Sequence, residues 1–179
     1  QSIDGQGIRN APYSPDFAVN NYTYSDTNNT ASVSQPHGVG FVFATMLWDL
    51  TWAFIDEYGF DPDLSDGNGG NNKIMQLVID GLKLAPCSAG FVDMRDAILL
   101  ADELTNEGAN KCLIWSKFAA RGLGYLADQG DTNSRTDQVE DFSVPTICEE
   151  ASNNLDAGVI SFDSPESGVL SNSENISIT

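Results

Sequence analysis

Four stretches of this chain repeat apolar residues at three- and four-residue steps, and short loops separate them. This spacing places apolar side chains on one side of an α-helix. We therefore predict helices over residues 38–58, 73–84, 90–105 and 109–123. Because short connections favour neighbouring helices, the expected fold is mainly α, a bundle of about four helices.

The stretch 38–58 is the longest of the four. Its predicted core stripe consists of Phe41, Ala44, Leu47, Trp48, Trp52 and Ile55. Phe43, Met46 and Phe54 widen the stripe, so we expect this helix to be buried on most sides. Gly59 follows directly and is the expected C-terminal cap.

The remaining sequence divides the chain into three expected regions. Residues 1–36 combine Gly, Pro, Asn, Ser and Thr with several aromatic residues, which indicates an ordered irregular loop. Residues 37–125 hold the helices. Residues 126–179 are acidic and have no Lys or Arg after Arg135, which predicts a largely flexible linker or tail. Two segments there have the composition of short strands and would begin a following β-domain: 159–162 and 176–178.

The net charge of the chain is −18, from 26 acidic and 8 basic residues. Nucleic acid and anionic membrane surfaces are bound through clustered Lys and Arg, so we expect neither as a partner. The longest apolar run, 41–55, contains Asp49 and is too short to predict a membrane span. The acidity fits a secreted or saline setting, and the polar start at Gln1 predicts a mature or excised segment.

The three cysteines, Cys87, Cys112 and Cys148, include no C-x-x-C pair, which excludes a zinc knuckle or a thioredoxin motif. In an oxidising compartment, the simplest arrangement is one disulfide and one free thiol. Cys87 and Cys112 flank the predicted helix 90–105 and form the favoured pair. Buried free thiols are the alternative.

The segment 61–72 superficially resembles a calcium-binding loop. Its register does not fit, because Gly67 stands one place too late for the D-x-D-x-D-G pattern that would start at Asp61. A solvated acidic turn is therefore the favoured interpretation. Calcium at 61–72, as in a calcium-dependent adhesion segment, is the alternative.

The chain contains one histidine, His37, at the start of the longest predicted helix. A zinc hydrolase site normally uses two or more histidines with a glutamate or cysteine. A serine or cysteine hydrolase needs a base beside its nucleophile. We therefore expect no metal site in this sequence, and His37 can serve only one task. Without further information, a helix-start residue satisfied by backbone or solvent is the simplest interpretation.

Four blocks closely resemble, in order and spacing, the C-terminal part of the fungalysin zinc metallopeptidases: HGVGFVFATMLWDLTWAFIDEYG, KIMQLVIDGLKLAPC, FVDMRDAILLAD and GANKCLIWSKFAARGLG. The upstream GIRNAPYSPD is similar to the family's preceding segment, so the resemblance covers roughly residues 5–125. It implies a thermolysin-like design in which an N-terminal lobe carries the zinc-binding H-E-x-x-H. This chain resembles the mostly helical second lobe and contains no H-E-x-x-H.

The resemblance also implies roles for three residues. His37 matches the second-lobe histidine that hydrogen-bonds the oxyanion formed during peptide hydrolysis. Arg9 matches the arginine that binds the substrate carbonyl beyond the scissile bond, and Ile8 would help to line an apolar substrate pocket. The residues before His37, SVSQP, lack the carboxylate that usually accompanies this histidine. Arg95 and Arg121 fall in matching blocks and are interpreted as structural ion pairs; a surface ion pair is also the alternative for Arg9.

The expected function is therefore that of the C-terminal lobe of a secreted zinc-dependent metalloendopeptidase, inactive in isolation. Zinc and the general base would belong to the N-terminal zinc-binding lobe of the same polypeptide, and the substrate would be a peptide or protein. The alternative is a non-catalytic helical binding or interaction module that descends from such a peptidase. An upstream H-E-x-x-H in the gene product would discriminate between the two.

Overall fold

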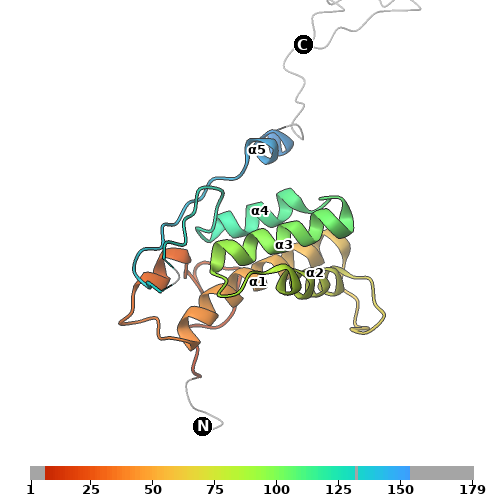
Figure 1. Ribbon diagram of the computed structural model, residues 1–179. Helices are drawn as coiled ribbons and strands as arrows, with labels where there is room; N and C mark the ends of the chain where they lie inside the picture. Colours follow the sequence, from red (N-terminus) through yellow and green to blue (C-terminus); the bar gives the residue numbers. More distant parts are fainter. Residues whose placement is uncertain (1–6, 132, 154–179) are drawn as a thin grey trace, which may run out of the picture. The chain divides into compact units, whose positions relative to one another are not determined.

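The computed structural model describes residues 7–131 and 133–153, which are mainly helical (Figure 1). The elements are the 3₁₀ helix η1 (Tyr24–Asn28) and the α-helices α1 (His37–Tyr58), α2 (Gly70–Leu84), α3 (Phe91–Asn106), α4 (Lys111–Ala120) and α5 (Thr146–Asn153). The expected mainly α fold is confirmed. The four predicted helices correspond to α1–α4, and their observed ends lie within three residues of the predicted ones.

The chain divides into two compact units, Gln1–Pro145 and Thr146–Thr179. The first unit contains η1 and α1–α4, and the described part of the second is α5. The predicted strands at 159–162 and 176–178 lie outside the described residues.

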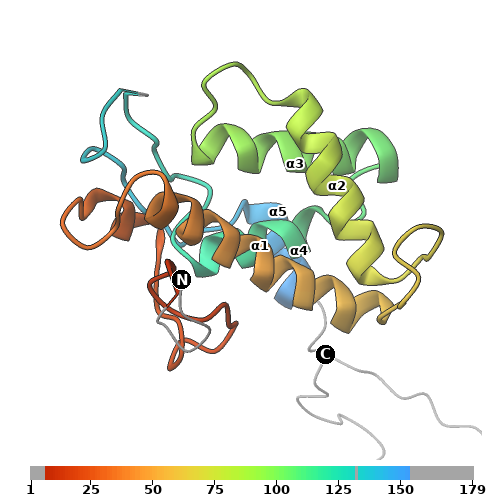
Figure 2. The same cartoon turned by 90° about the horizontal axis from the view of Figure 1, so that it is seen from below.

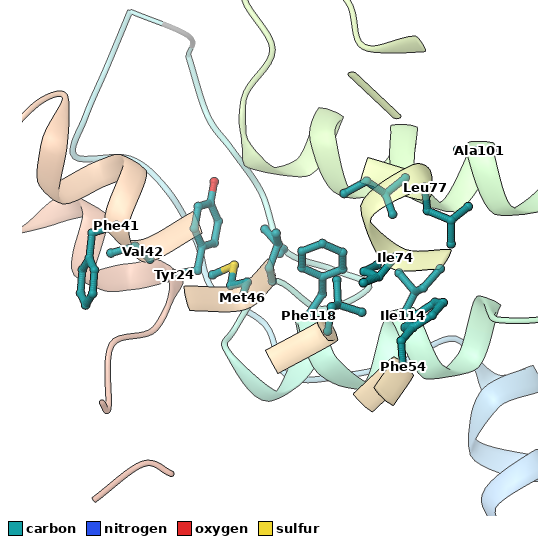
Figure 3. Packing of buried hydrophobic residues seen from close by; sticks show 14 of the residues in the cluster. Tyr24, Phe41, Val42, Met46, Phe54, Ile74, Leu77, Ala101, Ile114 and Phe118 are labelled. Atoms are coloured by element: carbon teal, nitrogen blue, oxygen red, sulfur yellow. The ribbon is translucent and has the colours of Figure 1, made fainter. Parts of the chain in front are cut away.

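Helix α1 is the centre of the first unit, because η1, α2 and α4 all pack against it, while α3 packs on α2 and α4. In Figure 2, α1 crosses in front of α4. The core side chains of these helices interdigitate with Tyr24 from η1 (Figure 3). Ten of them are labelled in that view: Tyr24, Phe41, Val42, Met46, Phe54, Ile74, Leu77, Ala101, Ile114 and Phe118.

The buried face of α1 differs from the predicted stripe. Four fully buried residues follow four-residue steps: Val42, Met46, Leu50 and Phe54. Phe41, which was in the predicted stripe, and Thr45 are also fully buried. By contrast, Trp48 is 38% exposed and Trp52 is 43% exposed, although both were expected in the core. Apolar residues occur on several sides of this helix, so their spacing alone does not select the side that α2 and α4 cover.

Two glycines allow the chain to turn from α1 into α2. Gly59 has φ +77° and its N–H donates to the carbonyl of Ile55 at 2.7 Å, which confirms the predicted cap. At Gly70 a Cβ atom would lie 1.9 Å from the carbonyl oxygen of Phe54. Only a residue without a side chain fits this close approach, so Gly70 sets the start of α2 directly against the end of α1.

Residues 122–131 and 133–143, which we call the return segment, pack as part of the first unit. The backbone groups of Asp128 and Val139 exchange two hydrogen bonds of 2.9 Å each. The carboxylate of Glu140 accepts a 2.8 Å bond from the Thr23 hydroxyl, and Arg135 donates to the carbonyl of Val33 at 2.8 Å. We expected the tail to begin at residue 126. The compact unit instead continues to Pro145. Its polar side chains Arg135 and Glu140 hold it by hydrogen bonds to residues 33 and 23.

Helix α1 is long and apolar enough to cross a membrane by length and composition, with a mean hydropathy of 1.5 over its most apolar window. Half of that window is buried inside the protein. Asp49, within the window, pairs with the buried guanidinium of Arg121 at 2.6 Å. This pattern is typical of the central helix of a folded globular domain, where the apolar side chains form the core.

The predicted pairing of Cys87 with Cys112 is wrong. Cys87 is an exposed free thiol, whereas Cys112 and Cys148 are disulfide-bonded. Cys87 precedes α3 and Cys112 follows it, and a helix of 16 residues is about 24 Å long. Disulfide formation needs Cα atoms within about 7 Å, and flanking one helix in the sequence does not bring two cysteines that close.

Candidate functional site

Two of the predicted site residues meet at the start of α1. One guanidinium nitrogen of Arg9, Nη1, donates a 2.8 Å hydrogen bond to the main-chain oxygen of His37, 28 residues further along the chain. Both residues are exposed. Ile8, the neighbour of Arg9, is 56% exposed. We call this group of three residues the Arg9–His37 edge.

The backbone on the Arg9 side of the edge is held by Asn10. Its Nδ2 group donates to the hydroxyl of Tyr22 at 3.1 Å and to the carbonyl of Ser32 at 2.8 Å. The ring of Tyr22 packs edge-on against Phe41 of α1, with ring centroids 5.2 Å apart. The exposed residues Ile8 and Arg9 are therefore positioned by Asn10, whose side chain is hydrogen-bonded to a tyrosine that packs on the core.

The backbone on the His37 side is fixed by the turn that starts α1. The carbonyl of Ser34 accepts from the N–H groups of Gly38 at 2.7 Å and Val39 at 3.0 Å. A Cβ atom at Gly38 would lie 2.9 Å from the backbone carbonyl carbon of Val33, which is itself completely buried. Because residue 38 is a glycine, the loop that precedes α1 can pack closely against the start of the helix beside His37.

The edge combines three chemical abilities. An imidazole can donate a hydrogen bond at the first turn of a helix, and a guanidinium offers five N–H donors in a fixed plane. Within residues 7–131 and 133–153, the His37 carbonyl is the only hydrogen-bond acceptor recorded for Arg9, so further donors can bind a ligand. The exposed Ile8 side chain adds an apolar contact beside them.

A second arginine, in the core, joins α1 to the described residues that precede it, 7–36, which we call the N-terminal segment. Arg121, at the end of α4, is completely buried and makes two contacts with Asp49 of α1, from Nε at 2.6 Å and from Nη2 at 3.3 Å. Its remaining donors bind three carbonyls of the N-terminal segment: Ser14 at 3.0 Å, Asn20 at 2.5 Å and Tyr22 at 3.2 Å.

This arrangement confirms the interpretation of Arg121 as a structural ion pair. Sequence reasoning missed Asp49 as its partner. The signal was present, because Asp49 is the single charged residue in an otherwise apolar run, and a charge in such a position needs a partner. Arg95 is also structural: it pairs with Asp96 at 2.8 Å, and its guanidinium lies 4.5 Å from the centre of the Trp115 ring.

The acidic loop 61–72 uses its carboxylates to close its own turns. Asp63 accepts backbone hydrogen bonds from Ser65 at 3.0 Å and Asp66 at 3.1 Å, and these N–H groups lower the pKa of its carboxyl. Asp61 accepts from the backbone of Asn68 at 3.1 Å. Among the described residues, no group of three or more His, Cys, Asp or Glu side chains could hold a metal ion.

Residues 2–127 of the chain match the sequence model of a metallopeptidase family. That family is the fungalysin metallopeptidases (M36), and the chain belongs to it. The resemblance inferred from the sequence blocks is thereby confirmed.

Three similar proteins illustrate the relationship. The chain is 44% identical to extracellular metalloproteinase 3 of Arthroderma otae over 74% of its own length. It is 40% identical to extracellular metalloproteinase 2 of Trichophyton tonsurans and 43% identical to extracellular metalloproteinase 10 of Coccidioides posadasii, in each case over 79% of its length. These relatives are extracellular, and this membership places the chain among secreted proteins. The chain spans about a fifth of the length of these relatives, since the matches cover 21–22% of them.

Proposed function

We propose that this chain is the C-terminal lobe of a secreted zinc-dependent metalloendopeptidase and that its Arg9–His37 edge binds the peptide substrate. Membership of the fungalysin family supports the reaction class. The observation that carries the assignment of the site is the 2.8 Å hydrogen bond between Arg9 and the main chain of His37. It joins at one exposed edge two residues to which the family design gives neighbouring roles on one substrate.

His37 acts as a hydrogen-bond donor to the scissile carbonyl. When a peptide bond is attacked, negative charge develops on that carbonyl oxygen, and a donor already in place stabilises the transition state more than the ground state. His37 is suited to this role because its backbone belongs to the first turn of α1 and does not need to reorganise. A single donor of this kind contributes about 2.7–4 kcal/mol to the lowering of the barrier.

Arg9 orients the substrate. One of its N–H groups donates to the His37 carbonyl, which holds the guanidinium at the start of α1. The other N–H groups donate to a substrate carbonyl beyond the scissile bond. Ile8 is assigned to an apolar side chain of the substrate on the leaving-group side, and its 56% exposure leaves it available for this contact.

Zinc would be held outside the described residues, in the N-terminal lobe of the same polypeptide. The described part of the chain offers no suitable ligand set, so its own contribution is binding and charge stabilisation. The 179-residue chain alone is therefore inactive in this proposal. A zinc-dependent peptidase activity of the isolated chain would contradict it.

The test uses the natural polypeptide that contains this chain. His37→Gln should lower kcat by about 10²- to 10³-fold with little change in KM, because the lost hydrogen bond forms in the transition state. Arg9→Ala should mainly raise KM, because the guanidinium binds the substrate in both states. Lys83→Gln removes an exposed cation from α2, away from the edge, and serves as the control.

The kinetic outcome also discriminates the alternative. If the natural polypeptide hydrolyses peptides and His37→Gln retains its kcat within about threefold, the oxyanion role is wrong. If the natural polypeptide has no peptidase activity under any metal loading, the chain is a non-catalytic helical module that descends from a peptidase.

A further inference from the structure

We propose that an aromatic face formed by α1 and by residues 13–17 is the surface that the N-terminal, zinc-binding lobe of the same polypeptide covers. This inference rests on the proposed function and extends it, because it names the surface through which the two lobes are held together. We define the aromatic face by four residues: Tyr13, Phe17, Trp48 and Trp52.

The aromatic face is open in this chain. Phe17 is 45% exposed, Trp48 is 38% exposed and Trp52 is 43% exposed. Three of the rings are in contact, with centroids 6.3 Å apart for Tyr13 and Trp48 and 6.1 Å apart for the two tryptophans. Phe17 lines the same hollow as Trp52. Clustered Trp and Tyr side chains of this kind provide large contact area at low entropic cost, and they are enriched among the residues that dominate protein interfaces.

The helical geometry places this face on the same side of α1 as His37. Trp48 and Trp52 follow His37 by 11 and 15 residues. At 3.6 residues per turn, these positions are rotated by only about 20° and 60° from His37 about the helix axis. Phe41, at about 40° on this side, is already covered by the rings of Tyr13 and Tyr22. A structure that approaches His37 to complete the active site, and continues over these rings for about 22 Å along α1, covers both tryptophans.

A hollow of about 300 Å³ opens beside the face. It is lined by the apolar side chains of Pro15, Phe17, Trp52 and Ala53, together with the charged groups of Asp56 and Lys117. Such a hollow can receive an anchoring apolar side chain of the partner, and the charged groups can contribute to a polar rim.

The other lobe of the enzyme is the occupant that best fits these observations. The relatives are about five times as long as the part that this chain matches, so a large partner within the same polypeptide is available. A second copy of this chain is disfavoured, because each copy carries a net charge of −18 and the copies repel one another. An anionic lipid surface is disfavoured by the same charge.

The experiment compares oxidative footprinting of the natural polypeptide with that of the 179-residue chain. The oxidation rates of Trp48 and Trp52 should fall at least about fivefold in the natural polypeptide, because the core of an interface excludes water. Trp115 is 6% exposed and should react slowly in both proteins, which makes it the buried reference. Equal rates for Trp48 and Trp52 in the two proteins would overturn the inference.

A matched pair of variants provides a second measurement. In the isolated chain, Trp52→Ser and Tyr125→Ser should lower the melting temperature by similar amounts, since both side chains are about half exposed. In the natural polypeptide, Trp52→Ser should lower the melting temperature clearly more than Tyr125→Ser does. Equal effects in both proteins would contradict the inference.

The outcomes separate this inference from the proposed function. Protection of Trp48 and Trp52 in a polypeptide without peptidase activity would support the interface and contradict the enzymatic role. Peptidase activity without protection would support the enzymatic role and contradict the interface. Protection that appears in the isolated chain as its concentration rises would identify a second copy as the occupant and overturn the inference.

Discussion

Two arginines bind the N-terminal segment to the helical body, and their surroundings are opposite. Arg121 is completely buried and bonds to Asp49 and to three backbone carbonyls. Arg9 is exposed and has one recorded acceptor among the described residues, the carbonyl of His37. An arginine whose donors are all used inside the core is structural, whereas one with spare donors at the surface can bind a ligand.

The largest expected effect comes from removing the buried arginine. Arg121→Met should lower the free energy of unfolding by about 3–5 kcal/mol, because Asp49 then remains charged and unpaired in the core. Chemical denaturation followed by circular dichroism measures this loss. Adding Asp49→Leu should recover part of it, since the double variant contains no unpaired charge. A loss no greater than that of the exposed cation variant Lys83→Gln would contradict the structural role.

A glycine pair tests whether the exposed edge has a fixed backbone. Gly38→Ala should destabilise the chain by about 1–3 kcal/mol, because the new Cβ overlaps the backbone of Val33. Gly40 lies one half-turn further along α1, and a Cβ added there would meet no neighbouring atom within 4 Å. Gly40→Ala should therefore be neutral or stabilising, as alanine favours helix. Equal melting temperatures for the two variants would show that the edge is pliable.

Removing the exposed arginine should have a much smaller effect on stability than removing Arg121. Arg9→Ala is expected to change the free energy of unfolding of the isolated chain by less than about 0.5 kcal/mol, because its single hydrogen bond is open to solvent. The same denaturation assay measures it. A loss comparable to that of Arg121→Met would remove the distinction between the two arginines.

The smallest expected effect is at acid pH and concerns the return segment. Asp141 accepts hydrogen bonds from the hydroxyl of Ser143 and from the backbone of Leu126 and Ser143, and these bonds hold the pKa of its carboxyl below the ordinary value. A lowered pKa stabilises the fold above the unfolded-state value of 3.8, and this contribution is lost as the pH falls through the folded-state pKa.

The variant Asp141→Asn should therefore weaken the dependence of stability on pH below about 4. Urea denaturation at several pH values measures it, with the exposed carboxylate variant Glu57→Gln as the control. The same pH dependence in Asp141→Asn and the unmodified chain would show that this carboxylate does not contribute.

Much of the helical body could be predicted from the sequence, because helix positions depend on residues three and four apart. The four predicted helices occur, and the cap at Gly59 is where the glycine stands. The buried face of α1 could not be predicted, because apolar side chains surround the helix and long-range partners decide which of them are covered. The exposed Trp48 and Trp52 are the consequence.

The candidate site was only partly predictable. Sequence blocks indicated His37, Arg9 and Ile8 separately, but the contact between Arg9 and His37 bridges 28 residues and depends on how Asn10 and Tyr22 pack. The cysteine pairing failed for a similar reason. Proximity to one helix in the sequence suggested Cys87 with Cys112, while the length of α3 separates its two ends.

The helices follow from the local spacing of apolar residues, the strong negative charge from composition and the family from the matched blocks, so all three are readable from the sequence alone. The tertiary structure decided which arginine is buried, which side of α1 is open and how far the compact unit extends. The physical reason is that burial and hydrogen-bond partners are set by contacts between distant segments. The return segment illustrates this, because its acidic sequence predicted a tail and its bonds to residues 23–33 made it part of the fold.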